Sequence, residues 1–278
     1  MKLSNNSLRS HKNKIEKYYS DNERIEREKY FYLKFKKKKL NIPKLLAVYE
    51  NKISLKKYKL KKLNSQKIFF YELLNFLIKI NKEKNYNLYA KEYLKNYSSL
   101  LKQVSERFQK IPKIKLEKKY LSKMKLIKSY IKKIIEESPS SAKLSQCRKI
   151  ISQSDIGFHN CGIYNNKVLF YDFEYAGLDH PIKLICDVYY QPEKKINKKY
   201  MLKFVNKLEK VFKFKIPKNF SVFEKLLKVK MMLIILNIFT ISNINIKSKI
   251  INTSKLSKLK LERINKAYKY IKIPFLCE

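Results

Sequence analysis

The three glycines of this 278-residue chain all lie within one segment, Ser152–Asp187. Glycine lets a backbone turn sharply or approach another group closely, so a chain with so few glycines can do this at few places. The segment also holds five of the 23 acidic residues and two of the three histidines: Asp155, Asp172, Glu174, Asp179, Asp187, His159 and His180. Carboxylates gathered in a lysine-rich chain suggest that they hold a positive group, most simply a metal ion. We therefore expect the functional site in Ser152–Asp187.

The formal charge of +42 raises nucleic-acid binding as an alternative function. Only six of the 65 basic residues are arginine, however, and base recognition and bidentate phosphate binding favour arginine. The lysines are spread along the whole chain together with many Ile and Asn residues, which is typical of an AT-rich genome. We interpret the charge as compositional, and nucleic acid is not an expected partner.

Neither the cysteines nor the apolar residues indicate a zinc module or a membrane protein. The four cysteines have no Cys-x-x-Cys pair and no histidine partner at zinc-ligand spacing, so we expect reduced, mostly buried thiols. The longest apolar run, Met231–Ile241, is too short to span a bilayer and is interrupted by Asn237. Met1–Lys17 lacks the apolar core of a signal peptide. The expected protein is cytoplasmic, with no membrane span.

The order of predicted elements separates a short first part from a long helical second part. In the first part, apolar patterns predict a helix at Glu23–Lys39 and strands at Ile15–Tyr19, Leu45–Tyr49 and Ile53–Tyr58. Beyond residue 60 we expect helices at Ser65–Ile80, Leu88–Lys110, Lys118–Glu137, Pro181–Tyr190, Lys198–Phe212, Val222–Phe239 and Ser254–Ile271. The expected architecture is an α+β fold with two domains, residues 1–60 and residues 61–278.

Three residues in Ser152–Asp187 have the spacing of a phosphoryl-transfer site. Asp155 and Asn160 form the pattern Asp-x-x-x-x-Asn, and Asp172 follows a predicted hairpin that turns at Asn165-Asn166. Transfer of a phosphoryl group from ATP needs one carboxylate to orient the acceptor hydroxyl and take its proton. An amide and a second carboxylate can then hold Mg²⁺ against the phosphates, because Mg²⁺ prefers oxygen ligands. The alternative, carboxylates that only cap helices and turns, applies best to Asp179.

The segment resembles the aminoglycoside phosphotransferase and choline kinase superfamily through the sequences SDIGFHN, LFYDFEYAG and DHPIKLICD. Members carry a His-x-Asp-x-x-x-x-Asn catalytic loop and an Asp on the next strand, often as Asp-Phe-Glu-Tyr-Ala-Gly. The resemblance implies that Asp155 is the catalytic base and that Asn160 and Asp172 bind the metal. It also implies supporting roles for Glu174, within Asp-Phe-Glu, and for Asp187, which would brace the catalytic loop. The implied fold is protein-kinase-like and two-lobed, with a reduced β-rich N-terminal lobe that binds ATP and a large, mainly helical C-terminal lobe.

The resemblance further implies a strand lysine in the small lobe that contacts the ATP phosphates, and a helix glutamate that pairs with it. Lys17, at the end of a predicted strand, and Glu28, within the next predicted helix, fit these positions. Lys14 and Glu26 are the alternatives, because a lysine-rich sequence offers many matches.

The sequence departs from the family in two places. No glycine-rich loop precedes the strand lysine, so Ser4-Asn5-Asn6-Ser7 would serve as the turn over the phosphates. The small lobe is then either minimal or begins upstream of this sequence. Gln153 stands where the family has its histidine, a residue with a structural role in the family.

Three functions are consistent with the sequence. The leading one is an ATP- and Mg²⁺-dependent phosphotransferase that acts on a hydroxyl of a small-molecule substrate. The second is a catalytically weak kinase-like binding or regulatory protein, suggested by the missing glycines, and the third is a nucleic-acid-binding protein, suggested only by charge. The presence of Asp155, Asn160 and Asp172 together favours the first, because an inactive site need not keep all three.

The acceptor substrate is expected to be neutral or anionic. From Gln191 to Glu278 the chain has five acidic residues against 22 Lys and Arg. Such a surface repels a polycationic aminoglycoside, even after screening by salt. A sugar or a surface-polysaccharide precursor fits this charge better than an antibiotic.

Overall fold

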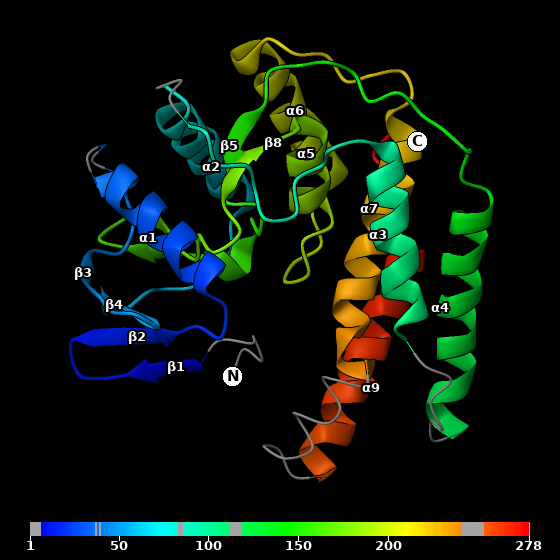
Figure 1. Ribbon diagram of the computed structural model, residues 1–278, viewed down its shortest axis with the longest axis horizontal. Coiled ribbons are helices and arrows are strands. Elements are labelled where there is room, and N and C mark those ends of the chain that lie inside the picture. Colours follow the sequence, from blue (N-terminus) through cyan, green and yellow to red (C-terminus); the bar gives the residue numbers. More distant parts are fainter. Residues whose placement is uncertain are drawn as a thin grey trace. The chain divides into compact units, whose positions relative to one another are not determined.

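The computed structural model describes residues 7–36, 38, 40–82, 86–111, 118–240 and 253–277. The chain divides into two compact units, which are Met1–Tyr93 with Cys147–Lys215 (unit 1) and Leu94–Gln146 with Ile216–Glu278 (unit 2). Unit 1 combines strands with helices, whereas the described elements of unit 2 are helical (Figure 1). This mixture confirms the predicted α+β class. Unit 1 contains residues of both expected domains, so the division at residue 60 stays a prediction.

A four-stranded antiparallel sheet forms the first part of unit 1. Its strands, in the spatial order β1-β2-β4-β3, are Ser7–Ser10 (β1), Lys14–Tyr18 (β2), Leu45–Val48 (β3) and Lys52–Lys56 (β4). Of the predicted turn Ser4–Ser7, residues 4–6 lie outside the described residues, and Ser7 begins β1.

Helix α1 (Asn22–Lys36) follows β2 directly and presents one buried face. Phe31, Tyr32 and Phe35 on this face are almost completely inaccessible to solvent. Glu28 precedes them by three, four and seven residues, which is the spacing of one face of a helix. The helix therefore carries an acidic side chain into the same interior as its aromatic residues, and Glu28 is 1% exposed.

Two small antiparallel sheets hold the predicted site segment. Their strands are Ile150–Ser152 (β5) with Gly177–Asp179 (β8), and Cys161–Tyr164 (β6) with Lys167–Phe170 (β7). Asn165 and Asn166 form the β6–β7 turn with φ of 46° and 58°, the left-handed conformation that a two-residue hairpin turn requires and that Asn tolerates. The predicted hairpin is confirmed. Strands β1, β5 and β8, of three or four residues each, were not predicted.

Close backbone contact explains one of the glycines. Ala90 N donates to Leu178 O at 3.0 Å, and Leu178 N donates to Leu88 O at 2.9 Å, so residues 88–90 run alongside β8. A Cβ atom on Gly177 would lie 2.3 Å from Ala90 N, which leaves no room for a side chain. The helix predicted from Leu88 therefore begins later, at Tyr97 (α3, Tyr97–Gln109).

Helix α2 (Gln66–Ile80) packs against the site segment through two pairs of stacked aromatic rings. Phe69 stacks on Phe158 with ring centroids 4.3 Å apart, and Phe76 stacks on Phe170 at 4.7 Å. These contacts hold the turn before β6 and the end of β7 against one helix. The unit is completed by α5 (Pro181–Tyr189) and α6 (Lys198–Phe212).

Unit 2 consists of α3 with α4 (Lys118–Glu136), α7 (Phe220–Ile235), the 3-10 turn Leu236–Phe239 and α9 (Thr253–Ile271). Helix α7 packs against α3 and α9, and α4 packs against α9. Lys228 of α7 donates to Ile273 O at 2.7 Å and lies 4.2 Å from the centre of the Phe275 ring, which ties the end of the chain to α7. Within the described ranges, every helix is too short or too polar to cross a membrane. The four cysteines are free thiols.

Candidate active site

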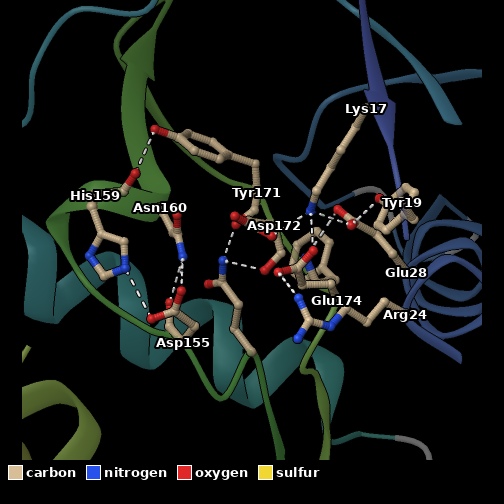
Figure 2. Close-up of polar contacts among 12 residues, drawn as sticks. Lys17, Tyr19, Arg24, Glu28, Asp155, His159, Asn160, Tyr171, Asp172 and Glu174 are labelled. Atoms are coloured by element: carbon tan, nitrogen blue, oxygen red, sulfur yellow. Dashed lines mark hydrogen bonds and ion pairs between the residues drawn. The ribbon is translucent and has the colours of Figure 1, made fainter. Parts of the chain in front are cut away.

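Asp155 lies on the loop that follows β5, with its carboxylate held by two neighbours (Figure 2). Asn160 donates from Nδ2 to the backbone O of Asp155 at 2.8 Å and to Asp155 Oδ2 at 3.0 Å. His159 Nε2 lies 3.0 Å from Asp155 Oδ1. The side chain of Asp155 is nevertheless 43% exposed, whereas Asn160 is fully buried. The loop therefore presents an oriented carboxylate to solvent.

Asp172 follows β7 and is brought beside the loop by the hairpin. Tyr171 N donates to Asn160 O at 3.1 Å, which joins the two ends of the β6–β7 unit. Asp172 has a φ of 73°, an uncommon conformation for a residue other than glycine. Gln153 donates from Nε2 to the backbone carbonyls of Tyr171 and Asp172, with a distance of 3.2 Å to the latter. Gln153 thus stabilises the backbone at this strained position.

Lys17 of β2 lies at the centre of a cluster of carboxylates. Its Nζ is 2.7 Å from Glu28 Oε2, 2.7 Å from Asp172 Oδ1 and 2.9 Å from Glu174 Oε2. The structure thus brings together the predicted lysine and glutamate, and it adds two acids from the site segment. The alternatives lie elsewhere: Lys14 contacts Glu16 at 3.0 Å, and Glu26 pairs with Lys29 at 3.1 Å. The roles of Lys17 and Glu28 toward ATP stay predictions.

Burial and charge act against each other in this cluster. Burial lowers the pKa of Lys17, but the carboxylates of Glu28, Asp172 and Glu174 outweigh it and hold that pKa well above its usual value. Burial raises the pKa of Glu28, and the ammonium of Lys17 opposes this shift. Tyr19 donates its hydroxyl to Glu28, and Phe173 N donates to Glu28 Oε1 at 3.2 Å. Glu28 is therefore held by donors on both of its oxygens.

The same carboxylates could hold a divalent cation. Glu28, Asp172 and Glu174 each offer an oxygen, and these oxygens lie within 4.8 Å of one another. Carboxylate oxygens are the ligands that Mg²⁺ prefers, so the donor set fits the predicted metal. Of the two predicted ligands, Asp172 belongs to this group, while the Nδ2 of Asn160 is bonded to Asp155 and only its Oδ1 could ligate a cation.

Asp187 is linked to the loop of Asp155 through a series of contacts, and its bracing role stays a prediction. Lys183 Nζ lies 2.6 Å from Asp187 and 3.3 Å from Asp179, and all three side chains are largely buried. Asp179 in turn accepts from Ser154 Oγ at 3.5 Å, directly before Asp155 in sequence. This chain of contacts connects α5 to the loop. Asp179 accepts a hydrogen bond from His180 N at 2.8 Å, but the N-cap of α5 is His180, whose side chain accepts from Ile182 N.

Sequence reasoning missed two basic residues of the site. Lys183 lies four residues from both Asp179 and Asp187, a spacing that indicates ion pairs on a helix and could have identified it. Arg24 of α1 lies 3.6 Å from Glu174 and 3.4 Å from Asp21. No sequence signal distinguishes Arg24, because its contact with Glu174 joins residues that are distant in the chain.

Comparison with known proteins supports the fold through structure and not through sequence. No family model and no curated protein matches the chain. Spectinomycin phosphotransferase APH(9)-Ia, solved with ADP and spectinomycin, is similar with a TM-score of 0.58 and 11% identity, over 98% of this chain and 91% of that chain. A choline/ethanolamine kinase family protein from Mesorhizobium loti is similar with a TM-score of 0.55 and 10% identity, over 98% of this chain and 86% of that chain. Choline kinase LicA from Streptococcus pneumoniae is similar with a TM-score of 0.53 and 12% identity, over 97% of this chain and 91% of that chain. The chain therefore has the kinase-like α+β fold of the aminoglycoside phosphotransferases and choline kinases, the fold that its segment Ser152–Asp187 predicts.

Proposed function

We propose that the protein is a phosphotransferase that moves the γ-phosphoryl group of ATP to a hydroxyl of a small molecule, with Mg²⁺ as cofactor. The observation that carries this proposal is the meeting of Lys17, Glu28 and Asp172, from two distant parts of the sequence, in one cluster of ion pairs. Asp155 lies on the loop joined to Asp172 through Asn160. Similar structures were solved with ADP, with ATP, or with AMP-PNP and Ca²⁺, which supports a nucleotide and a divalent cation here.

Asp155 is the group that would act on the acceptor. Its carboxylate is exposed and oriented, so it can accept a hydrogen bond from the acceptor hydroxyl. As the hydroxyl oxygen attacks the γ-phosphorus, its proton passes to the carboxylate and ADP leaves on the opposite side. Positioning is the main task, because the transfer requires the attacking and leaving oxygens to be in line.

Lys17 is the group that would contact the phosphates. Glu28 holds its ammonium from α1, in the manner of the lysine–glutamate pair of kinases. Asp172 and the Oδ1 of Asn160 would hold Mg²⁺, with Glu174 beside them. When bound, the cation neutralises phosphate charge and supplies electrostatic stabilisation of the transferring group.

Calorimetry with ATP, with and without Mg²⁺, tests the binding step, and ATP turnover with panels of sugars, amino alcohols and nucleosides tests the reaction. We expect millimolar or tighter ATP binding that requires Mg²⁺. Equal ATP affinity in both conditions, or no binding at all, would favour a kinase-like binding protein. Turnover that is stimulated by an acceptor and abolished by Asp155→Ala would support the phosphotransferase.

The acceptor we propose is neutral or anionic, such as a sugar or a surface-polysaccharide precursor. This rests on the shortage of acids after Gln191, where five acidic residues stand against 22 Lys and Arg. Several similar structures are of aminoglycoside phosphotransferases, so the antibiotic alternative has a direct test. Expression in a sensitive bacterium should leave kanamycin and gentamicin resistance unchanged. Resistance that disappears with Asp155→Ala would show that the acceptor is an aminoglycoside.

A further inference from the structure

Gly157 makes room for the ring of His159. The backbone of Gly157 is extended, at a φ of −179°, so its conformation does not require glycine. A Cβ atom at this position would lie 2.6 Å from Nδ1 and 2.7 Å from Cε1 of His159, and 2.9 Å from Oε1 of Gln191. The absence of a side chain at Gly157 therefore allows the imidazole to lie against the loop that carries Asp155.

The ring of His159 completes the hydrogen bonding of the Asp155 carboxylate. His159 Nε2 is 3.0 Å from Asp155 Oδ1, while Asn160 Nδ2 is 3.0 Å from Asp155 Oδ2 (Figure 2). An ionised carboxylate only accepts, so the ring nitrogen that faces it must carry the proton. The final torsion of an aspartate side chain is broad, and one donor alone leaves the carboxylate free to rotate about it. A separate donor on each oxygen fixes the plane of the carboxylate.

His159 is itself held in place from the hairpin. Tyr171 donates its hydroxyl to the backbone O of His159 at 3.1 Å and lies 3.4 Å from Cys161 O. The imidazole side chain is 13% exposed, so protein atoms enclose most of it. A donor fixed in this way can orient a partner, whereas a mobile surface histidine cannot.

We propose that His159 is a positioning residue, which donates Nε2–H to Asp155 and turns its carboxylate toward the acceptor hydroxyl. The inference rests on the proposed phosphotransferase function and adds a residue to it. Each carboxylate oxygen keeps a further acceptor site, so Asp155 can still bind the hydroxyl and take its proton. Loss of the donor should affect the transfer step and leave ATP binding intact, because the ring of His159 bonds Asp155, whereas Lys17 is held by Glu28, Asp172 and Glu174.

Two substitutions separate the donor from the ring. His159→Phe keeps a ring against Gly157 but has no donor, and His159→Gln keeps an amide donor but has no ring. We expect His159→Phe to lower kcat about tenfold or more, with the KM for ATP changed less than about twofold, because misplaced catalytic groups cost rate more than affinity. His159→Gln should recover most of the lost kcat. The matched control is His11→Phe, since His11 also faces a carboxylate, Glu16 at 3.1 Å, and should leave kcat unchanged.

Gly157→Ala supplies a second test. The added methyl group should displace the imidazole and lower kcat in the wild-type background. In the His159→Phe background the donor is already absent, so Gly157→Ala should lower kcat much less. A non-additive pair of this kind supports positioning through the ring, whereas equal losses in both backgrounds would indicate a general effect on the loop and would contradict the proposal.

A direct readout comes from the ring nitrogens. The chain has three histidines, so ¹⁵N spectra can be assigned with single substitutions. We expect His159 to carry its proton on Nε2 and to respond to Asp155→Asn. The inference about His159 would be overturned if His159→Phe kept the full kcat, or if the ¹⁵N signals of His159 did not change in Asp155→Asn. Either result would leave the proposed phosphotransferase function standing. A wild-type protein that binds no ATP and transfers no phosphoryl group would instead overturn the proposed function, together with the catalytic role given to His159.

Discussion

Lys17 Nζ lies 2.7 Å from Oδ1 of Asp172, a contact that joins residues 155 positions apart in the chain. The same ammonium contacts Glu28 and Glu174, so one cation serves three carboxylates. ATP phosphates would draw Lys17 away from the three carboxylates, and a divalent cation could then bind those carboxylates in its place. The cation in turn would free Lys17 to contact the phosphates. We therefore expect ATP and the metal to bind cooperatively.

Lys17→Met should destabilise the fold and make its stability depend on a divalent cation. Removing the ammonium leaves buried carboxylates without their partner, which costs about 3–5 kcal/mol for a buried ion pair. Denaturant unfolding at neutral pH measures the loss, and Mg²⁺ should restore more stability to the variant than to the wild type. Lys14→Met is the matched control: its ion pair with Glu16 involves a half-exposed side chain, and such pairs contribute about 0–1 kcal/mol. Equal effects of the two substitutions would contradict a central role for Lys17.

Asp155→Asn should separate catalysis from binding. The amide keeps the size of the side chain but cannot accept a proton, so we expect turnover to fall by about 10² or more. ATP affinity should change little, since the Asp155 carboxylate is bonded to Asn160 and His159, whereas Lys17 is held by Glu28, Asp172 and Glu174. Asp172→Ala should instead weaken Mg²⁺-dependent ATP binding and turnover together. Measurement of kcat together with calorimetric affinity distinguishes the two, and a nearly active Asp155→Asn would show that another residue is the base.

Spacing along the chain selected the candidate residues that lie close in sequence, and their catalytic and metal-binding roles stay predictions. Asp155, Asn160 and Asp172 occupy one loop and one hairpin, so local pattern alone could place them together. Lys17 and Glu28 could be selected only through resemblance, because a lysine-rich sequence offers rivals at each position. The fold discriminates among them by burial, since Lys17 and Glu28 face the interior while Lys14 and Glu26 face solvent.

Other features depend on tertiary contacts that no local pattern contains. Strands β5 and β8 have three residues each, too few to show an alternating pattern. They form because Ile150–Ser152 pairs with Gly177–Asp179 as antiparallel strands. A glycine in the sequence indicates a close contact but does not identify the atoms that make it. Gly177 is required by the backbone of Ala90, and Gly157 by the ring of His159.

Glu16 should give the sheet a pH dependence in the acid range. Hydrogen bonds and charge from Lys14, Lys52, Tyr18 and His11 lower the pKa of Glu16 from 4.5 to about 2. A folded-state pKa below the unfolded value means that the carboxylate stabilises the fold above pH 4.5 and loses this effect as the pH falls toward 2. The difference in unfolding free energy between wild type and Glu16→Gln should therefore shrink as the pH falls below 4.5. A difference that stays constant down to pH 2 would contradict a lowered pKa of Glu16.

Gln153 offers a test of how the backbone of Asp172 is held in its left-handed conformation. Its Nε2 must face the carbonyls of Tyr171 and Asp172, because an amide oxygen there would face two acceptors. Its Oε1 is buried and finds no donor among the residues that the structure describes. Gln153→Leu removes the donor from two part-buried backbone carbonyls and should lower the unfolding free energy by about 1–3 kcal/mol for the two hydrogen bonds together.

Gln153→His, which introduces the residue found at this position in the superfamily that the segment resembles, should behave differently. A histidine can donate from one ring nitrogen, and its other ring nitrogen has one acceptor lone pair where the amide oxygen of Gln153 has two. We therefore expect Gln153→His to be at least as stable as the wild type and to retain Mg²⁺-dependent ATP binding, while Gln153→Leu loses affinity because Asp172 is no longer fixed. Unfolding curves and calorimetry on the two variants measure both quantities. If leucine and histidine destabilise the protein equally, side-chain volume and not the donor is what position 153 supplies.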